Sequence, residues 1–200
     1  MAQTQIDLFE ERRLVLPEGF RYQPGLIDAA EERRLLEAMR ALPFKPFEFQ
    51  GFLGKRETVS FGWRYDFNGG GLSKTNDMPE FLLPLRAAAA AFAGLDPEKL
   101  QQVLLTKYPP GSTIGWHNDR SVFGEVIGIS LLSPATFRFR RKNGEKWERA
   151  SIVAEPRSAY LLAGLARTEW QHSIPAVESL RYSITFRNLK ECTFPGCAAA

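Results

Sequence analysis

Two histidines and one aspartate carry the strongest chemical signal in this 200-residue sequence. His117 and Asp119 stand two residues apart in GWHND, and His172, the only other histidine, follows in EWQHSI. On extended backbone this i, i+2 spacing points an imidazole and a carboxylate to the same side, where both can bind one metal ion. A third ligand from a distant strand would complete a two-histidine, one-carboxylate face with open positions, as in non-haem Fe(II) sites. Such His-x-Asp pairs are common, and an ordinary hydrogen-bonded histidine explains the triplet taken alone.

A second pattern begins nine residues after His172, in the segment RYSITFR. Its apolar residues alternate with a polar set, which comprises Arg181, Ser183, Thr185 and Arg187. An exposed polar face would make this an ordinary amphipathic strand. If that face instead points into a barrel, two guanidiniums in a low-dielectric interior need a doubly charged anion. Arginine binds carboxylates bidentately, and a small dicarboxylate that also chelates iron is 2-oxoglutarate.

Two helices are expected in the N-terminal half, ahead of these residues. The first spans 28–42, because apolar residues recur at helical spacing after a capping Asp28 and stop at Pro43. The second spans 79–92, where an alanine run precedes Gly94 as a terminator.

The chain after Leu100 has the pattern of a β-structure. Its short apolar segments recur at roughly 10-residue spacing between Pro, Gly or Asn turns: QVLLTKY, EVIGISLLS, TFRFRR, WERASIVAE, SAYLLAG, TEWQHSI and LRYSITFRNL. These segments predict a sandwich or barrel. The helices precede the strands without alternating with them, and no phosphate-binding glycine loop is present, which excludes a doubly wound nucleotide-binding fold.

An aromatic segment separates the two expected helices. In FGWRYDFN the rings alternate with smaller or polar residues, so a continuous strand would place four rings on one face: Phe61, Trp63, Tyr65 and Phe67. Packing on the core is one interpretation of this face.

The ordered set Tyr108, His117-x-Asp119, His172 and Arg181-x-Ser-x-Thr-x-Arg187 resembles the AlkB family of Fe(II)/2-oxoglutarate dioxygenases, over about residues 100–189. The segments YPPGSTIGWHND, ISLLSP, PRSAYLLAG and RYSITFR are similar to family segments, and SFGWRYDF resembles the aromatic strand of the family's nucleotide-recognition lid. The resemblance implies an α+β, mainly β fold. That fold is a double-stranded β-helix (jelly roll) with N-terminal helices packed on one sheet and a lid.

The resemblance also implies how the chain is organised and which residues act. One domain would cover 1–200, with helices and lid in 1–99, the catalytic core in 100–189 and a tail in 190–200. The implied iron ligands are His117, Asp119 and His172. The implied 2-oxoglutarate contacts are Tyr108, Arg181, Thr185 and Arg187, together with Thr106 and Ser183, which stand where the family often has asparagine. The implied substrate contacts are Trp63, Arg64, Tyr65, Ser121 and Arg140.

The activity implied by the resemblance needs Fe(II), 2-oxoglutarate and O₂. It is the oxidative dealkylation of N-alkylated nucleobases in DNA, or in RNA, with release of succinate, CO₂ and an aldehyde. Two other functions stay open. The same chemistry could act on a modified tRNA base or a protein side chain, because Ser121 stands where the best-known repair enzyme has an acidic base-contacting residue. The chain could also be a catalytically silent jelly-roll binding module.

Charge and hydropathy limit the kinds of binding partner that the sequence predicts. The net charge of +3 leaves nucleic acid open, and six cations gather in residues 138–149, either as a solvated hairpin or as phosphate contacts. No apolar stretch reaches the roughly 20 residues of a membrane helix, and the start lacks the order of a signal peptide. We therefore expect a cytoplasmic monomer without a membrane partner, in which Cys192 and Cys197 are free thiols.

Overall fold

The computed structural model describes residues 16–49, 51–69 and 71–190. In these residues the strands form a major sheet, a minor sheet and a small ribbon. The major sheet comprises β1 (Phe20–Gln23), β2 (Lys45–Phe49), β3 (Phe52–Phe61), β6 (Gln102–Tyr108), β8 (Phe123–Leu131), β11 (Ala159–Leu162) and β13 (Arg181–Leu189). The minor sheet comprises β7 (Ile114–His117), β9 (Ala135–Asn143), β10 (Lys146–Ala154) and β12 (Gln171–Ile174). The ribbon comprises β4 (Trp63–Asp66) and β5 (Gly71–Lys74).

The strand order identifies the architecture as a jelly roll. The major sheet runs β1-β11-β8-β13-β6-β3-β2 and the minor sheet β10-β9-β12-β7, with antiparallel pairing throughout. Apolar side chains from both sheets share one core cluster, in which Phe137 and Phe139 of β9 meet Tyr160 of β11. The predicted barrel of short strands is therefore confirmed.

Three α-helices and two 3₁₀ turns complete the described part of the chain. They are α1 (Ala29–Arg40), η1 (Glu80–Leu82), α2 (Leu83–Ala93), η2 (Pro97–Lys99) and α3 (Gly164–Thr168). The side chain of Asp28 accepts a hydrogen bond from the backbone N of Glu31 (2.7 Å), as the capping pattern predicts. Helix α2 ends at Gly94, whose φ of +74° is the left-handed conformation that glycine tolerates best.

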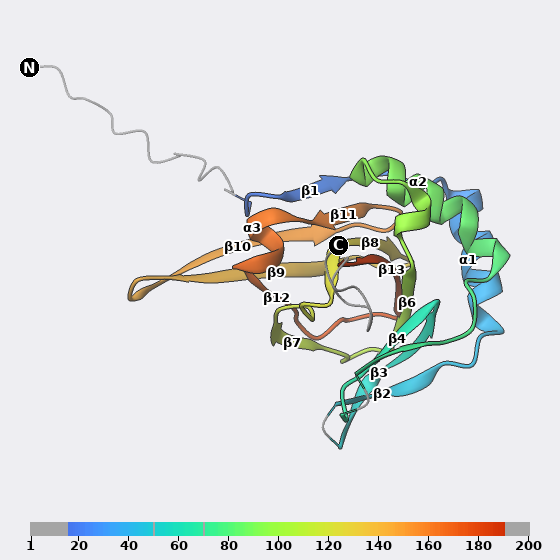
Figure 1. The fold of residues 1–200 in the computed structure, drawn as a ribbon, viewed down its shortest axis with the longest axis horizontal. Coiled ribbons are helices and arrows are strands. Elements are labelled where there is room, and N and C mark those ends of the chain that lie inside the picture. The colour runs from blue at the N-terminus through green and yellow to red at the C-terminus, as the bar shows by residue number, and fades with distance from the viewer. Residues whose placement is uncertain (1–15, 50, 70, 191–200) are drawn as a thin grey trace, which may run out of the picture.

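Helices α1 and α2 cover the major sheet, as predicted. Leu35 and Met39 of α1 and Leu85 of α2 are buried in one cluster with Ile184 and Phe186 of β13. Figure 1 shows the two helices on one side of the fold, while the β9–β10 hairpin projects on the other. Because α1 and α2 bury the apolar face of β13, its polar face must point into the barrel.

The N-terminal half contributes more to the sheet than the prediction of helices and a lid allowed. Strand β1 pairs with β11, and β3 pairs with β6, so both edges of the major sheet are extended by residues from the first 61. Edge strands expose unpaired backbone groups, and these additional strands cover them. The major sheet therefore continues across the predicted division between 1–99 and 100–189.

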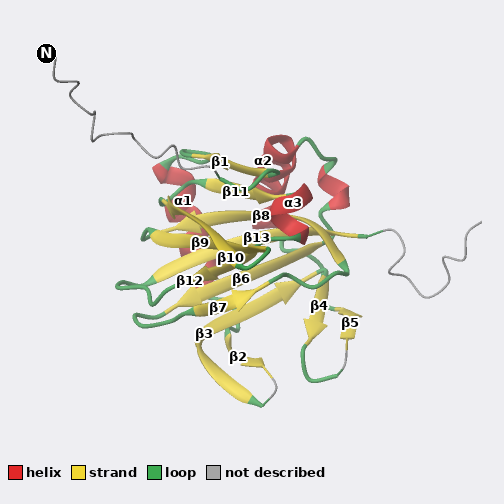
Figure 2. Ribbon diagram, turned by 90° about the vertical axis from the view of Figure 1, so that its left-hand side faces the viewer, coloured by secondary structure: helices red, strands yellow, loops and turns green. Residues whose placement is uncertain are grey.

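The aromatic segment is not one continuous strand. Gly62 has a φ of +75°, and a Cβ there would collide with the carbonyl oxygen of Gln101, so the chain turns between β3 and β4. Phe61 ends β3 in the core, whereas Tyr65 of β4 and Phe67 contact each other edge to face, with ring centroids 5.1 Å apart. The expected single face of four rings is thus divided. Figure 2 shows the β4–β5 ribbon beside β3, on the side away from α1 and α2.

No helix in the described ranges is long and apolar enough to cross a membrane. Cys192 and Cys197 lie outside the described residues.

Candidate active site

The two histidines face each other across neighbouring strands of the minor sheet. His117 is the last residue of β7, and the antiparallel register pairs it with His172 of β12, leaving the ring centroids 4.3 Å apart. Asp119 follows β7 by two residues, and His172 Nε2 lies 3.7 Å from its Oδ2. One ligand atom from each of the three residues lies within 4.8 Å of the others. The structure thus brings together the predicted metal ligands His117, Asp119 and His172.

The protonation states of this triad suit a divalent metal. His117 Nδ1 donates to the carbonyl oxygen of Gly115 (2.9 Å), which directs the lone pair of Nε2 to the other side of the ring. Burial opposes ionisation of Asp119, but the positive Arg187 guanidinium and the neighbouring histidines outweigh it and lower the pKa of the carboxyl to about 2. Burial lowers the pKa of His172 to about 4. At neutral pH the site therefore offers a carboxylate and an unprotonated imidazole, which are the forms that bind metal.

Arg187 supports the carboxylate ligand. Its Nη2 lies 3.5 Å from Asp119 Oδ1, and its Nη1 donates to Gln102 Oε1 (3.1 Å). The prediction placed Arg187 with Arg181 around one anion. Their surroundings differ, because Arg187 has the Asp119 carboxylate beside it, while no carboxylate of the described residues pairs with Arg181.

A third arginine, Arg167 of α3, was not predicted as a site residue. It donates hydrogen bonds to four backbone carbonyls: those of Asp119 (3.2 Å) and Arg120 (2.6 Å) in the loop after β7, and those of Phe123 (2.9 Å) and Gly124 (2.9 Å) at the start of β8. One buried guanidinium thus fixes the loop that carries the carboxylate ligand. No motif marks Arg167, because its partners lie more than 40 residues away along the chain.

Arg181 belongs to a cluster of buried polar side chains inside the barrel, named the polar chamber for its residues Tyr108, Ser130, Arg181 and Ser183. It is 1% exposed, its Nε and Nη2 approach Ser130 Oγ (3.3 and 3.2 Å), and its guanidinium stacks over the Tyr108 ring (4.8 Å). Its Nη1 has no hydrogen-bond partner among the described residues. A buried cation with an unmet donor requires an anion. The chamber therefore fits the distal carboxylate of 2-oxoglutarate.

The other predicted cosubstrate contacts line the same chamber. Ser183 lies opposite Thr106 in the β13–β6 pairing, and its Oγ is 3.4 Å from the Tyr108 hydroxyl. Thr185 follows on the same face of β13, and all of these side chains are buried. Ser130, which the sequence analysis did not select, completes the polar lining.

The predicted substrate contacts do not form a single group. Residues 118–122, which connect β7 to β8 and include Asp119, are called the ligand loop. Tyr65 of the ribbon lies under the guanidinium of Arg120 (4.9 Å), so the ribbon contacts this loop directly. Ser121 is exposed in the turn of that loop, and Arg64 is exposed on β4. Arg140 lies elsewhere, on the outer face of the minor sheet, while its neighbour Phe139 points inward.

This jelly roll, with its facial triad and buried cationic chamber, has the architecture of an iron- and 2-oxoglutarate-dependent oxygenase. The sequence profile of the 2OG-Fe(II) oxygenase superfamily matches residues 19–187, and the chain belongs to that superfamily. It is accordingly a 2-oxoglutarate-dependent dioxygenase domain, and the superfamily's cofactors are Fe(II), 2-oxoglutarate and O₂. Because the chain belongs to this enzyme superfamily, the alternative of a catalytically silent binding module is rejected.

Within the superfamily the chain is AlkB-like. It is 26% identical over 197 residues to the alkylated DNA repair protein ALKBH8 homolog of Arabidopsis thaliana, covering 86% of this chain and 55% of the relative, so the chain spans about half of that protein. It is 28% identical over 192 residues to the mitochondrial alpha-ketoglutarate-dependent dioxygenase alkB homolog 7 of Mus musculus, covering 86% and 80% of the two chains. The structure of OsALKBH1 shares the fold, with a TM-score of 0.63 at 15% identity over 87% of this chain and 98% of that one.

Proposed function

We propose that this chain oxidatively removes alkyl groups from the nitrogen atoms of nucleobases, in DNA or in RNA. The observation that carries the proposal is the joint presence of the His117, Asp119 and His172 triad and the unpaired Arg181 donor in an AlkB-like chain. When bound, Fe(II) and 2-oxoglutarate supply, with O₂, an oxidation that turns an N-methyl group into formaldehyde while 2-oxoglutarate becomes succinate and CO₂.

The chain's own residues position the reaction and exclude water from it. Asp119 is held by Arg187 from one side, and Arg167 fixes the backbone of its loop from another. Arg181 and Tyr108 would hold the distal carboxylate of the cosubstrate. These groups are ordered before substrate arrives, which lowers the cost of aligning the reacting atoms.

The ribbon is the proposed nucleotide-recognition lid. Its Tyr65 and Phe67 rings lie beside the ligand loop and are covered by the Arg120 guanidinium, 4.9 and 5.0 Å from the two ring centroids. A base that displaces Arg120 would stack on the same rings, since stacking on an aromatic side chain is worth about 1–3 kcal/mol per base. An alkylated pairing edge is buried in a duplex, so the enzyme must flip the nucleotide or act on single strands.

A second candidate keeps the chemistry and changes the substrate to a modified tRNA base or a protein side chain. The observation that favours it is Ser121, an exposed hydroxyl on the ligand loop where a carboxylate would read an exocyclic amine. A hydroxyl donates and accepts, so it discriminates less between bases than a carboxylate does.

Formaldehyde release from oligonucleotides that carry one N-methylated base tests the proposal. The panel compares DNA with RNA and single with double strands, and it includes methylated tRNA and peptide substrates. We expect release from the nucleic-acid oligonucleotides and none from His172→Ala, because that variant lacks one of the three ligands. Turnover confined to peptides would overturn the nucleobase proposal, and turnover confined to tRNA would select the second candidate.

A further inference from the structure

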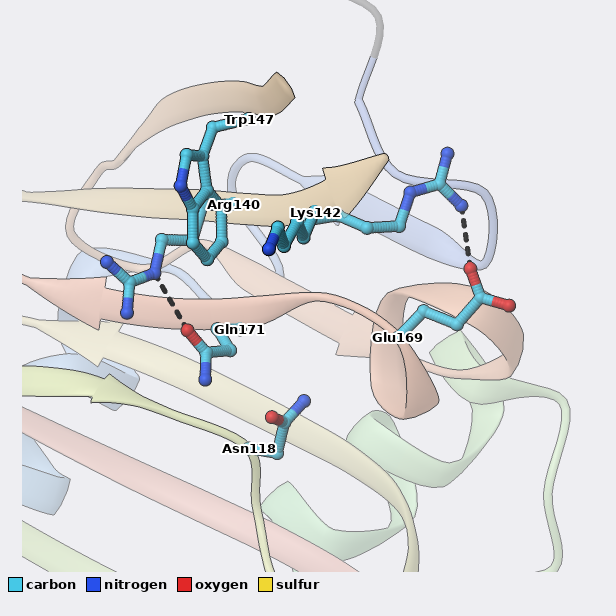
Figure 3. Close-up of a pocket in the computed structure, with 7 residues that line it drawn as sticks. Asn118, Arg140, Lys142, Trp147, Glu169 and Gln171 are labelled. Carbon is cyan, nitrogen blue, oxygen red and sulfur yellow. Dashed lines mark hydrogen bonds and ion pairs between the residues drawn. The ribbon is translucent and has the colours of Figure 1, made fainter. Parts of the chain in front are cut away.

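A pocket of about 390 Å³ lies on the outer face of the minor sheet, apart from the barrel interior. This outer pocket is lined by Asn118, Arg140, Arg141, Lys142, Trp147, Glu169 and Gln171. Figure 3 shows the labelled side chains, which come from β9, β10, the start of β12, and the residues that directly follow β7 and α3. Its volume falls within the range of about 300–1,000 Å³ that is usual for ligand sites.

The outer pocket adjoins the metal triad through the backbone. Asn118 directly follows His117, and Gln171 directly precedes His172. Successive residues of a strand point to opposite faces, so the metal ligands point into the barrel while their neighbours point outward. Two residues that line the outer pocket, Asn118 and Gln171, are therefore direct sequence neighbours of two predicted metal ligands on the opposite face of the minor sheet.

Two of the cationic side chains that line the outer pocket have no carboxylate partner among the described residues. Residues 138–149 contain six cations and two glutamates, an excess greater than the net charge of +3 for the whole chain. Arg141 is paired with Glu148 (2.8 Å) and Glu169 (2.7 Å). Among the described residues, by contrast, no carboxylate pairs with Arg140 or Lys142.

Arg140 is held in place as an anion-binding group. Its guanidinium lies over the rings of Trp116 (4.5 Å) and Trp147 (4.7 Å), and its Nε donates to Gln171 Oε1 (2.7 Å). Among the described residues no partner occupies its terminal nitrogens, so these donors remain available to an anion. Trp147 is 42% exposed, which leaves aromatic surface for a further planar group.

We infer that the outer pocket binds a nucleotide that flanks the target base in single-stranded nucleic acid. Its phosphate contacts Arg140 and Lys142, and its base stacks on Trp147. A cationic groove combined with an aromatic platform is the general arrangement for single strands, because every base has a π-face and every nucleotide a phosphate. This inference rests on the proposed function and specifies how that function holds its substrate strand.

Binding of an unmodified, fluorescently labelled single-stranded oligonucleotide tests the pocket without any turnover. We expect Trp147→Ala to weaken binding about 5- to 150-fold, and Trp147→Phe, which keeps a ring, to restore most of that loss. Arg140→Gln should weaken binding and reduce the slope of log Kd against log salt by about 0.7, the value for one lost phosphate contact. Arg33→Gln, which removes an exposed charge from α1 on the other side of the fold, is the matched control.

A second measurement separates failure of the pocket from failure of the proposed function. Formaldehyde release is compared between a methylated mononucleotide, which cannot reach the outer pocket, and a methylated oligonucleotide, which can. Arg140→Gln and Trp147→Ala should raise KM for the oligonucleotide and leave the mononucleotide unchanged. If both variants match Arg33→Gln in affinity and KM, the pocket inference is wrong even though dealkylation stands. If the variants lose affinity but no nucleic-acid substrate yields formaldehyde, the pocket stands and the proposed reaction is wrong.

Discussion

His117 and His172 are cross-strand partners, 55 residues apart in sequence and directly opposite in the β7–β12 register. The ladder itself therefore sets the spacing of the two imidazoles, with ring centroids 4.3 Å apart. A stacked Phe137 ring supports His172 from β9, 5.3 Å away. Because a slip of one residue in a strand would turn a histidine to the other face, the register that builds the barrel also builds the site.

Arg167 should control metal affinity without touching the metal. Replacing it with lysine removes the planar set of donors that reaches two carbonyls of the loop after β7 and two at the start of β8. We expect Arg167→Lys to weaken Fe(II) or Mn(II) binding about 10- to 100-fold, the usual cost of losing a group that orients a metal ligand. Calorimetric titration under anaerobic conditions measures this.

The control for that prediction is Arg33→Lys, an exposed arginine on α1. It should bind metal as the wild type does. If Arg167→Lys also keeps full affinity while its fold is intact by circular dichroism, the loop does not depend on this guanidinium.

We predict that 2-oxoglutarate raises the melting temperature of the protein only when Arg181 is present. A ligand that binds only the folded state raises the melting temperature, and the buried guanidinium of Arg181 is the proposed partner of the distal carboxylate. In the presence of Mn(II), we expect 2-oxoglutarate to raise the melting temperature of the wild type and to have little effect on Arg181→Gln.

Without ligand, Arg181→Gln should fold at least as stably as the wild type, because the substitution removes a buried charge that has no counter-ion. Arg181→Lys keeps the charge but loses the fork, so a partial response is expected. An undiminished response of Arg181→Gln to 2-oxoglutarate would contradict the assignment of the chamber.

The metal-free protein should lose stability in mild acid. His172 has a pKa lowered from 6.5 to about 4 by burial, so between these pH values the unfolded chain takes up a proton that the folded chain does not. The contribution of His172 to the free energy of unfolding is therefore present above pH 6.5 and is lost as the pH falls to about 4. The total loss is about 3 kcal/mol. Asp119 adds a similar loss only below pH 3.8.

Urea unfolding between pH 7 and 4.5 measures this loss, with His172→Gln as the comparison. The variant cannot titrate at this position, so its unfolding free energy should fall less steeply with acid. Parallel pH curves for the two proteins would show that His172 does not carry the effect.

The sequence by itself determined the chemistry and the local elements. The ends of α1 and α2 follow from Asp28 and Gly94, because caps act within one turn of helix. The triad and the polar face of β13 follow from residue type and spacing, because a strand repeats every two residues.

Only the tertiary structure decided which distant residues meet. Arg167 reaches a loop 43 residues away, and Arg140 reaches Gln171 across 31 residues, contacts that depend on how strands from separate segments pair. The same pairing draws β1 and β3 into the major sheet and makes Arg187 a partner of Asp119. Spacing along the chain records local geometry alone, whereas the surroundings of a buried arginine are set by every strand that packs around it.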